Sequence, residues 1–131
     1  MIWRSNSKMN FNSYQNGRWA EFWVCNFLRL KGYKILAQNY KTGRGTQAGE
    51  IDIIACQKQT IVFVEVKKRK NMDSAAYAIQ PKQKQRIING AQAFLQKNPQ
   101  YSEFDCRFDA VLVVSPLKMC HIPNAWQVEE M

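Results

Sequence analysis

The chain has 131 residues, of which 46% are hydrophobic, and its 19 Lys and Arg against ten Asp and Glu give a formal net charge of +9. A chain of this size can bury a core as one globular domain without disulfides. Its four cysteines are isolated and His121 is its only histidine, which argues against a structural zinc site and against Cys–His catalysis. The positive charge favours a polyanionic partner, nucleic acid ahead of an anionic membrane surface, with a generally basic solvated surface as the alternative.

The N-terminal segment, residues 1–13, is rich in Asn and Ser and lacks the apolar stretch of a signal peptide. We expect it to be a mobile arm, followed by a single domain over residues 14–131. No later segment is long enough to span a bilayer, so we expect a cytoplasmic protein without a membrane partner.

The first half of that domain begins with a helical pattern over about residues 15–31, apolar on two sides, and Gly32 is a suitable C-cap. Strands are predicted over 34–40 and then over 49–56 and 60–68. Residues 41–48 lack large apolar side chains, so we expect a loop there.

In the second half, residues 69–80 are expected to form a loop with some helical turn. Pro81 suits the first turn of a helix that runs to about residue 97. Residues 107–114 form a predicted strand, and a short extended piece over 120–122 is expected at a sheet edge. The order helix, three strands, helix, strand indicates an α/β fold whose mixed sheet has helices on its faces.

Two of the predicted strands carry charge where apolar side chains are normal. The first reads Gly49-Glu50-Ile51-Asp52-Ile53-Ile54, and the second contains Glu65-Val66-Lys67. Burying unpaired charge is costly, so these groups require a compensating reason. Because side chains alternate along a strand, Glu50 shares a face with Asp52, and Glu65 shares one with Lys67.

The pairing of these strands can be predicted from the turn between them. A two-residue turn at Lys58-Gln59 would give an antiparallel hairpin in which partner numbers sum to 117. Asp52 then lies opposite Glu65, and Glu50 opposite Lys67. The reverse face should be wholly apolar: Ile51, Ile53, Ala55, Val62, Val64 and Val66.

Two opposed carboxylates repel unless a cation lies between them or one is protonated. Their hard oxygen ligands suit Mg²⁺ or Mn²⁺, which can polarise a phosphate and lower the pKa of a bound water. Lys67 could position that water or stabilise charge developing on phosphorus. The alternative is a set of ordinary cross-strand ion pairs, Glu50 with Lys67 among them.

Glu21 lies on the helical stripe shared with Val24, Cys25 and Leu28. It is either an outer or second-metal ligand aimed at the sheet, or a carboxylate favoured by the start of the helix. Asp109 is either another acidic residue at the sheet edge or the partner of Arg107, and the partner role is the preferred interpretation.

A basic segment follows the acidic strands. Residues 58–86 contain eight basic and two acidic residues, a net charge of +6. These side chains could hold phosphates on either side of a metal, or form a solvated face. The candidates for nucleic-acid binding are Lys68, Arg69, Lys70, Lys82, Lys84 and Arg86.

Over about residues 16–126 the chain resembles the YraN-like proteins, an uncharacterised bacterial family regarded as predicted endonucleases related to archaeal Holliday-junction resolvases. The most specific matching segments are residues 49–55 and 62–67. The other matching positions are Gly17, Ala20-Glu21, Leu28, Gly32-Tyr33, Asn39-Tyr40, Ala78-Ile79, Pro81-Lys82-Gln83, Arg107-Phe108-Asp109, His121-Ile122 and Asn124-Ala125-Trp126.

The resemblance implies the PD-(D/E)XK nuclease fold, with a restriction-endonuclease-like core of order α-β-β-β-α-β and helices on both faces of the sheet. It implies metal binding by Asp52 and Glu65, a catalytic role for Lys67, and Glu21 as the acid of the first helix. The candidate accessory residues are Glu50 and Gln83.

Together these features predict a Mg²⁺- or Mn²⁺-dependent endonuclease that hydrolyses phosphodiester bonds in DNA, branched or otherwise structured DNA included, with RNA the less favoured partner. The alternative is a catalytically weak or inactive nucleic-acid-binding protein on the same fold. Resolvases commonly dimerise, but the sequence carries no marker of a homodimer.

Overall fold

The computed structural model describes residues 13–71 and 79–128. The expected N-terminal arm, up to residue 12, and residues 72–78 of the expected 69–80 loop lie outside the described residues. None of the helices within the described ranges is long and apolar enough to cross a membrane.

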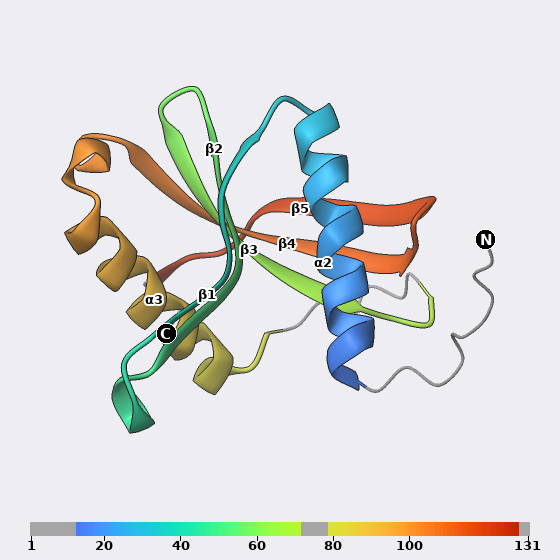
Figure 1. Cartoon of the computed structure of the whole chain (residues 1–131), viewed down its shortest axis with the longest axis horizontal. Helices are drawn as coiled ribbons and strands as arrows, with labels where there is room; N and C mark the ends of the chain where they lie inside the picture. Colours follow the sequence, from blue (N-terminus) through green and yellow to red (C-terminus); the bar gives the residue numbers. More distant parts are fainter. Residues whose placement is uncertain (1–12, 72–78, 129–131) are drawn as a thin grey trace.

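Two α-helices, two short 3₁₀ helices and five strands make up the described chain (Figure 1). Their order is α2 (Ser13–Leu30), β1 (Lys34–Thr42), η1 (Gly45–Gln47), β2 (Gly49–Gln57), β3 (Thr60–Lys68), α3 (Pro81–Lys97), η3 (Pro99–Tyr101), β4 (Asp105–Ser115) and β5 (Lys118–Trp126).

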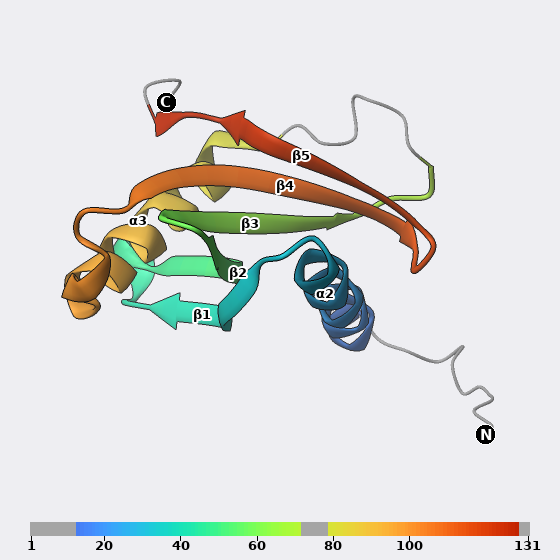
Figure 2. The ribbon, with the colours of Figure 1, turned by 90° about the horizontal axis from the view of Figure 1, so that it is seen from above.

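The strands form one mixed sheet in the order β1-β2-β3-β4-β5, which Figure 2 shows from above. Only β3 and β4 are parallel, and α3 lies in the crossover between them. The other neighbouring strands are antiparallel. This arrangement confirms the α/β class and is consistent with a restriction-endonuclease-like core.

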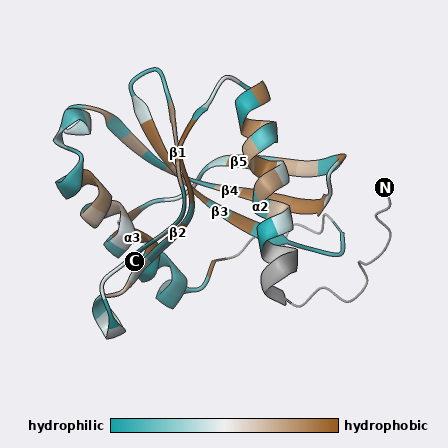
Figure 3. Cartoon of the chain, in the orientation of Figure 1, coloured by the Kyte–Doolittle hydropathy of each residue, from teal (hydrophilic) through white to brown (hydrophobic). Residues whose placement is uncertain are grey.

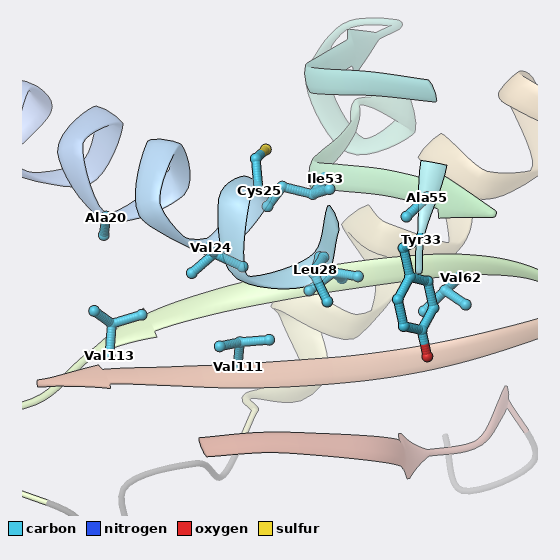
Figure 4. Close-up of a cluster of buried hydrophobic side chains, with 11 residues drawn as sticks. Ala20, Val24, Cys25, Leu28, Tyr33, Ile53, Ala55, Val62, Val111 and Val113 are labelled. Atoms are coloured by element: carbon cyan, nitrogen blue, oxygen red, sulfur yellow. The ribbon is translucent and has the colours of Figure 1, made fainter. Parts of the chain in front are cut away.

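The two long helices cover opposite faces of the sheet, and hydrophobic residues concentrate in the central strands between them (Figures 1 and 3). On one face, Val24 and Leu28 of α2 pack with Val111 and Val113 of β4 (Figure 4). On the other face, α3 packs through a second cluster whose members include Ile54, Phe63, Ile87 and Phe94. Both faces of the central strands are therefore buried.

The ends of the helices form as their sequences predict. Gly32 has φ +96°, a backbone conformation that favours glycine, and its N–H donates to the carbonyl of Arg29 at the end of α2. Pro81 opens α3, where its missing N–H costs no helical hydrogen bond.

The predicted register of the β2–β3 hairpin is confirmed. The five ladder pairs run from Ile53 opposite Val64 to Gln57 opposite Thr60, and every pair sums to 117. Lys58 takes φ +57°, as a tight two-residue hairpin turn requires.

Two expectations about the sheet need correction. The edge piece expected over 120–122 is a nine-residue strand, β5, with register irregularities on both sides of its central pairs. Ile51 does not share a face with Ile53, because Ile51 packs with the α3 cluster and Ile53 with the α2 cluster. The regular alternation of β2 therefore fails between these residues, at Asp52.

Candidate active site

The candidate catalytic groups lie where β2 and β3 separate. Ladder pairing ends at Ile53 and Val64. One residue further on, Oδ2 of Asp52 accepts a hydrogen bond of 2.8 Å from the backbone N–H of Val66. The side chain of Asp52 thus replaces the next backbone hydrogen bond of the ladder. We call this point, where β2 and β3 separate beyond Ile53 and Val64, the fork, and it brings the carboxyl group of Asp52 beside that of Glu65.

Asp52 has a strongly perturbed acidity. Burial and the neighbouring charge of Glu65 raise its pKa to about 8, and the charge of Glu21 adds to the rise. The hydrogen bond from Val66 opposes this rise but does not cancel it. This environment favours a proton on Asp52 that is donated to Glu65 in a hydrogen bond, unless a cation replaces the proton.

Glu65 is buried, with 6% of its surface exposed, and two polar side chains contact it besides Asp52. Its Oε2 lies 3.1 Å from the ammonium of Lys67, on the same face of β3. Its Oε1 accepts a 3.4 Å hydrogen bond from Nε2 of Gln83, at the start of α3. The predicted accessory residue Gln83 thus reaches the predicted site from the opposite layer to α2.

Glu21 approaches the same carboxylates from α2. Burial raises its pKa, and hydrogen bonds with the side chains of Asn39 and Asp52 offset only part of that rise. Its Oε1 is buried and has no hydrogen-bond partner among the described residues. This position beside Asp52 agrees with the alternative in which the Glu21 carboxylate is aimed at the sheet.

The backbone explains how Asp52 turns toward this group. Asn39 falls between Gln38 and Tyr40, whose ladder partners are Ile53 and Ile51, so it faces Asp52 across the β1–β2 pair. Asn39 adopts φ +50° within a strand, a left-handed conformation that asparagine tolerates better than most residues. The alternation of side chains between the two faces of the sheet therefore changes at Asn39 in β1 and at Asp52 in β2.

Glu50 does not join the cluster as expected. It pairs with Arg86 of α3 at 2.9 Å, whereas Lys67 pairs with Glu65, so the predicted meeting of Glu50 and Lys67 is wrong. The strands have already separated at this point, and α3 packs against the start of β2. A register predicted from the hairpin turn alone could not include the contact between Glu50 and Arg86.

The predicted nucleic-acid-binding side chains fall into different environments. Lys68 lies over the ring of Trp19 at 5.9 Å, and Lys84 over Trp126 at 5.6 Å. Arg69 donates to the carbonyl of Lys68 at 2.8 Å. Of the remaining candidates, Lys70 and Lys82 are exposed and Arg86 is the partner of Glu50.

A second acidic centre surrounds Asp109 on β4, which is fully buried. Arg107 donates to both of its oxygens, at 2.8 and 2.9 Å, and the backbone N–H of Asn124 donates at 2.9 Å. Nε2 of His121 lies 2.7 Å from Oδ2. Burial alone would raise the pKa of Asp109, but the hydrogen bonds from these donors hold it below its usual value.

The tautomer of His121 follows from its two neighbours. Nζ of Lys31 lies 2.6 Å from Nδ1, and a charged lysine can only donate, so Nδ1 accepts. Nε2 then carries the hydrogen and donates to Asp109. The preferred interpretation of Asp109 as a partner of Arg107 is confirmed, but sequence reasoning missed His121 and Lys31, because their separation of 90 residues gives no local signal.

Divalent-metal chemistry fits the first centre and not the second. Within the ranges 13–71 and 79–128, no three His, Cys, Asp or Glu side chains stand together as a ready-made metal cage. Mg²⁺ usually binds through one or two carboxylates, with water and substrate phosphate completing its shell. Asp52 and Glu65 could supply such a pair of carboxylates, and Glu21 lies beside Asp52, whereas the oxygens of Asp109 are already occupied by donors.

Comparison with known proteins identifies relatives that share most of the chain. The model of an uncharacterised protein family, UPF0102, matches residues 20–113. A UPF0102 protein of Rhodopseudomonas palustris (strain HaA2) is 47% identical over 114 residues, which cover 87% of this chain and 86% of that protein. One from Nitrobacter winogradskyi is 46% identical over 118 residues, covering 90% and 97% of the two chains.

A third relative, from Paramagnetospirillum magneticum, is 42% identical over 123 residues, covering 94% of this chain and 95% of that protein. The family match includes Glu21, the fork between β2 and β3, and all of α3. The resemblance to YraN-like proteins is thereby confirmed, and the chain belongs to the UPF0102 family.

Proposed function

We propose that this protein is a divalent-metal-dependent endonuclease that hydrolyses phosphodiester bonds in DNA, branched or otherwise structured DNA included. One observation carries the proposal. The carboxyl groups of Asp52 and Glu65 lie side by side in a buried fork, where burial and the charge of Glu65 raise the pKa of Asp52 and favour a proton there. A divalent cation between them would replace that proton and relieve the repulsion.

Under this proposal Asp52 and Glu65 hold Mg²⁺ or Mn²⁺, and Glu21 faces the same ion from α2. The bound ion would supply Lewis acidity toward a phosphate oxygen and a more acidic water. Lys67, which lies 3.1 Å from Glu65, would orient the attacking water or stabilise negative charge on the phosphate. Gln83 fixes the position of Glu65 through its amide.

Charge elsewhere supports a polyanionic substrate. The net charge of +9 favours association with DNA, and six basic residues lie on β3, directly after it or on α3, the elements that carry Glu65 and Gln83. Lys68, Arg69, Lys70, Lys82, Lys84 and Arg86 are the candidates for contacts with phosphates.

The test is a cleavage assay with branched, duplex and single-stranded DNA and with RNA, each with Mg²⁺, with Mn²⁺ and with EDTA. We expect metal-dependent cleavage of DNA by the wild type. Lys67→Ala should lower the rate by about 10²–10³-fold, since it removes one charged group acting on the transition state. Asp52→Asn should abolish cleavage and weaken Mn²⁺ binding, measured separately by calorimetry.

Lys118→Ala, a change at an exposed lysine on β5, provides the matched control and should leave cleavage unchanged. Cleavage that survives Asp52→Asn and Lys67→Ala would contradict the proposal. DNA binding by the wild type without metal-dependent cleavage of any substrate would favour the inactive nucleic-acid-binding alternative.

A further inference from the structure

A cavity of about 150 Å³ lies between α3 and the connection that contains η1. Four of its lining residues belong to α3 and recur at spacings of three and four, so they form one stripe of the helix. Two more come from the connection. The lining residues are Gly45, Thr46, Lys82, Gln85, Arg86 and Asn89.

The connection is fixed against α3, so the cavity has two defined walls. The amide of Asn89 donates to the carbonyl of Ala48 at 3.1 Å and to that of Thr46 at 3.5 Å. Gly49 approaches Gly90 so closely that a Cβ on Gly49 would lie 2.3 Å from the backbone nitrogen of Gly90. Only glycine permits this contact.

The groups that line the cavity suit an anion. Lys82 and Arg86 are cations, and none of the lining residues is acidic. Glu50 binds Arg86 through Nη2, but a guanidinium has five N–H donors, so this pair does not exhaust it. The hydroxyl of Thr46 can donate as well. A phosphate group is small enough for this volume and accepts several such hydrogen bonds.

The cavity is a near neighbour of the fork. Arg86 pairs with Glu50, which precedes Asp52 by two residues, about 7 Å along a strand. Lys82 adjoins Gln83, whose amide reaches Glu65 at 3.4 Å. A nucleic-acid strand that passes the carboxylates can therefore also reach the cavity.

We propose that this cavity binds a backbone phosphate of the substrate strand, close to the phosphodiester that is cleaved at Asp52 and Glu65. This inference rests on the proposed function and deepens it, since it assigns one wall of the strand's path to the η1 connection. Lys82 and Arg86 bind the phosphate from α3, and the hydroxyl of Thr46 donates to it from the opposite wall of the cavity.

The test couples one protein charge to one substrate charge. Binding of a short DNA substrate is measured without metal in an Asp52→Asn background, and each phosphate in turn is replaced by an uncharged methylphosphonate. We expect one phosphate whose neutralisation weakens binding about 5- to 10-fold. In a Lys82→Gln variant the same replacement should have no further effect, because that charge pair is already lost.

Lys84→Gln is the matched control, since Lys84 lies on the same helix but over Trp126. At the phosphate bound by the cavity, the loss of binding caused by Lys84→Gln and the loss caused by the methylphosphonate should simply multiply. The cavity assignment would be overturned if, at every phosphate, the methylphosphonate weakened binding by the same factor in Lys82→Gln, in Lys84→Gln and in the parent protein. This holds even if the wild type cleaves DNA. If the wild-type protein neither binds nor cleaves DNA, that result would instead contradict the proposed function itself.

Discussion

Two buried acidic centres lie on the same sheet, and they differ in how their charge is balanced. Asp109 is fully buried yet has a donor on every side, from Arg107, His121 and the backbone of Asn124. Asp52 sits among carboxylates, and its pKa rises to about 8. The charge of Asp109 is balanced by donors within the chain. At the other centre Lys67 pairs with Glu65, but burial and the neighbouring carboxylates still raise the pKa of Asp52, and a bound cation would offset that rise.

The difference predicts how the two centres affect stability. A carboxylate with a lowered pKa contributes to stability, because folding favours its charged form. A carboxylate with a raised pKa opposes folding when ionised, so its presence needs another reason. We expect substitutions at the two centres to change stability in opposite directions.

The largest effect should follow loss of Asp109. Asp109→Ala leaves Arg107 and His121 without their shared acceptor, and removing one member of a buried ion pair typically costs about 3 kcal/mol or more. Urea denaturation at pH 7 would measure this loss in the free energy of unfolding. Asp105→Ala, at an exposed position on the same strand, should change stability by less than about 0.5 kcal/mol. Similar losses in the free energy of unfolding for Asp109→Ala and Asp105→Ala would contradict the structural role of Asp109.

An effect of opposite sign is expected for Asp52→Asn in metal-free buffer. Because the folded pKa of Asp52 exceeds the unfolded value, the native state holds a proton that the unfolded chain releases. The associated stability is fully present below about pH 4 and is lost as the pH rises toward 8. Asparagine avoids this loss and can still accept from Val66, so the variant should be more stable at pH 8 by on the order of 2 kcal/mol.

Denaturation curves of both proteins from pH 4 to pH 9 would measure this difference. The stability gap should be smallest at pH 4 and should widen as the pH rises through 8. Added Mn²⁺ should stabilise the wild type at pH 8 but not the variant, and so narrow the gap. A gap that does not change with pH would contradict the shared-proton arrangement of Asp52 and Glu65.

The smallest effect should come from Asn39, which faces Asp52 from β1. Asn39→Ala should cost about 1 kcal/mol, since alanine tolerates the left-handed backbone less well. Asn39→Gly keeps that backbone but removes the amide that hydrogen-bonds Glu21. We therefore expect the glycine variant to retain most of the stability while its Mn²⁺ affinity falls several-fold. Calorimetry and urea denaturation would separate the two effects, and unchanged Mn²⁺ affinity in both variants would remove Asn39 from the site.

Local rules were sufficient for much of the fold and for the core of the candidate site. Side-chain alternation and a two-residue turn predicted the β2–β3 register, and hence the neighbourhood of Asp52 and Glu65. Helical spacing placed Glu21 on the buried stripe of α2. These features depend on residues close together in sequence.

The errors arose where distant segments or irregular backbone decide. Arg86 takes Glu50 because α3 packs on β2, a contact between residues 36 positions apart. Ile51 packs on the opposite face from Ile53, beside the left-handed Asn39 of the paired strand, whereas periodicity assumes a regular strand. Strand β5 was underestimated because Pro123 and a left-handed Asn124 interrupt its pattern, although pairing with β4 extends through Trp126.

The contact between Gly49 and Gly90 has a consequence for how this family can vary. It sets the spacing between α3 and β2, because the two backbones meet with no side chain between them. Any other residue at position 49 would force the helix outward, and Gln83 and Arg86 would move with it. In relatives that keep this geometry, we therefore expect a change at position 49 to require a compensating shift of the whole helix, so the pair limits the substitutions open to both segments at once.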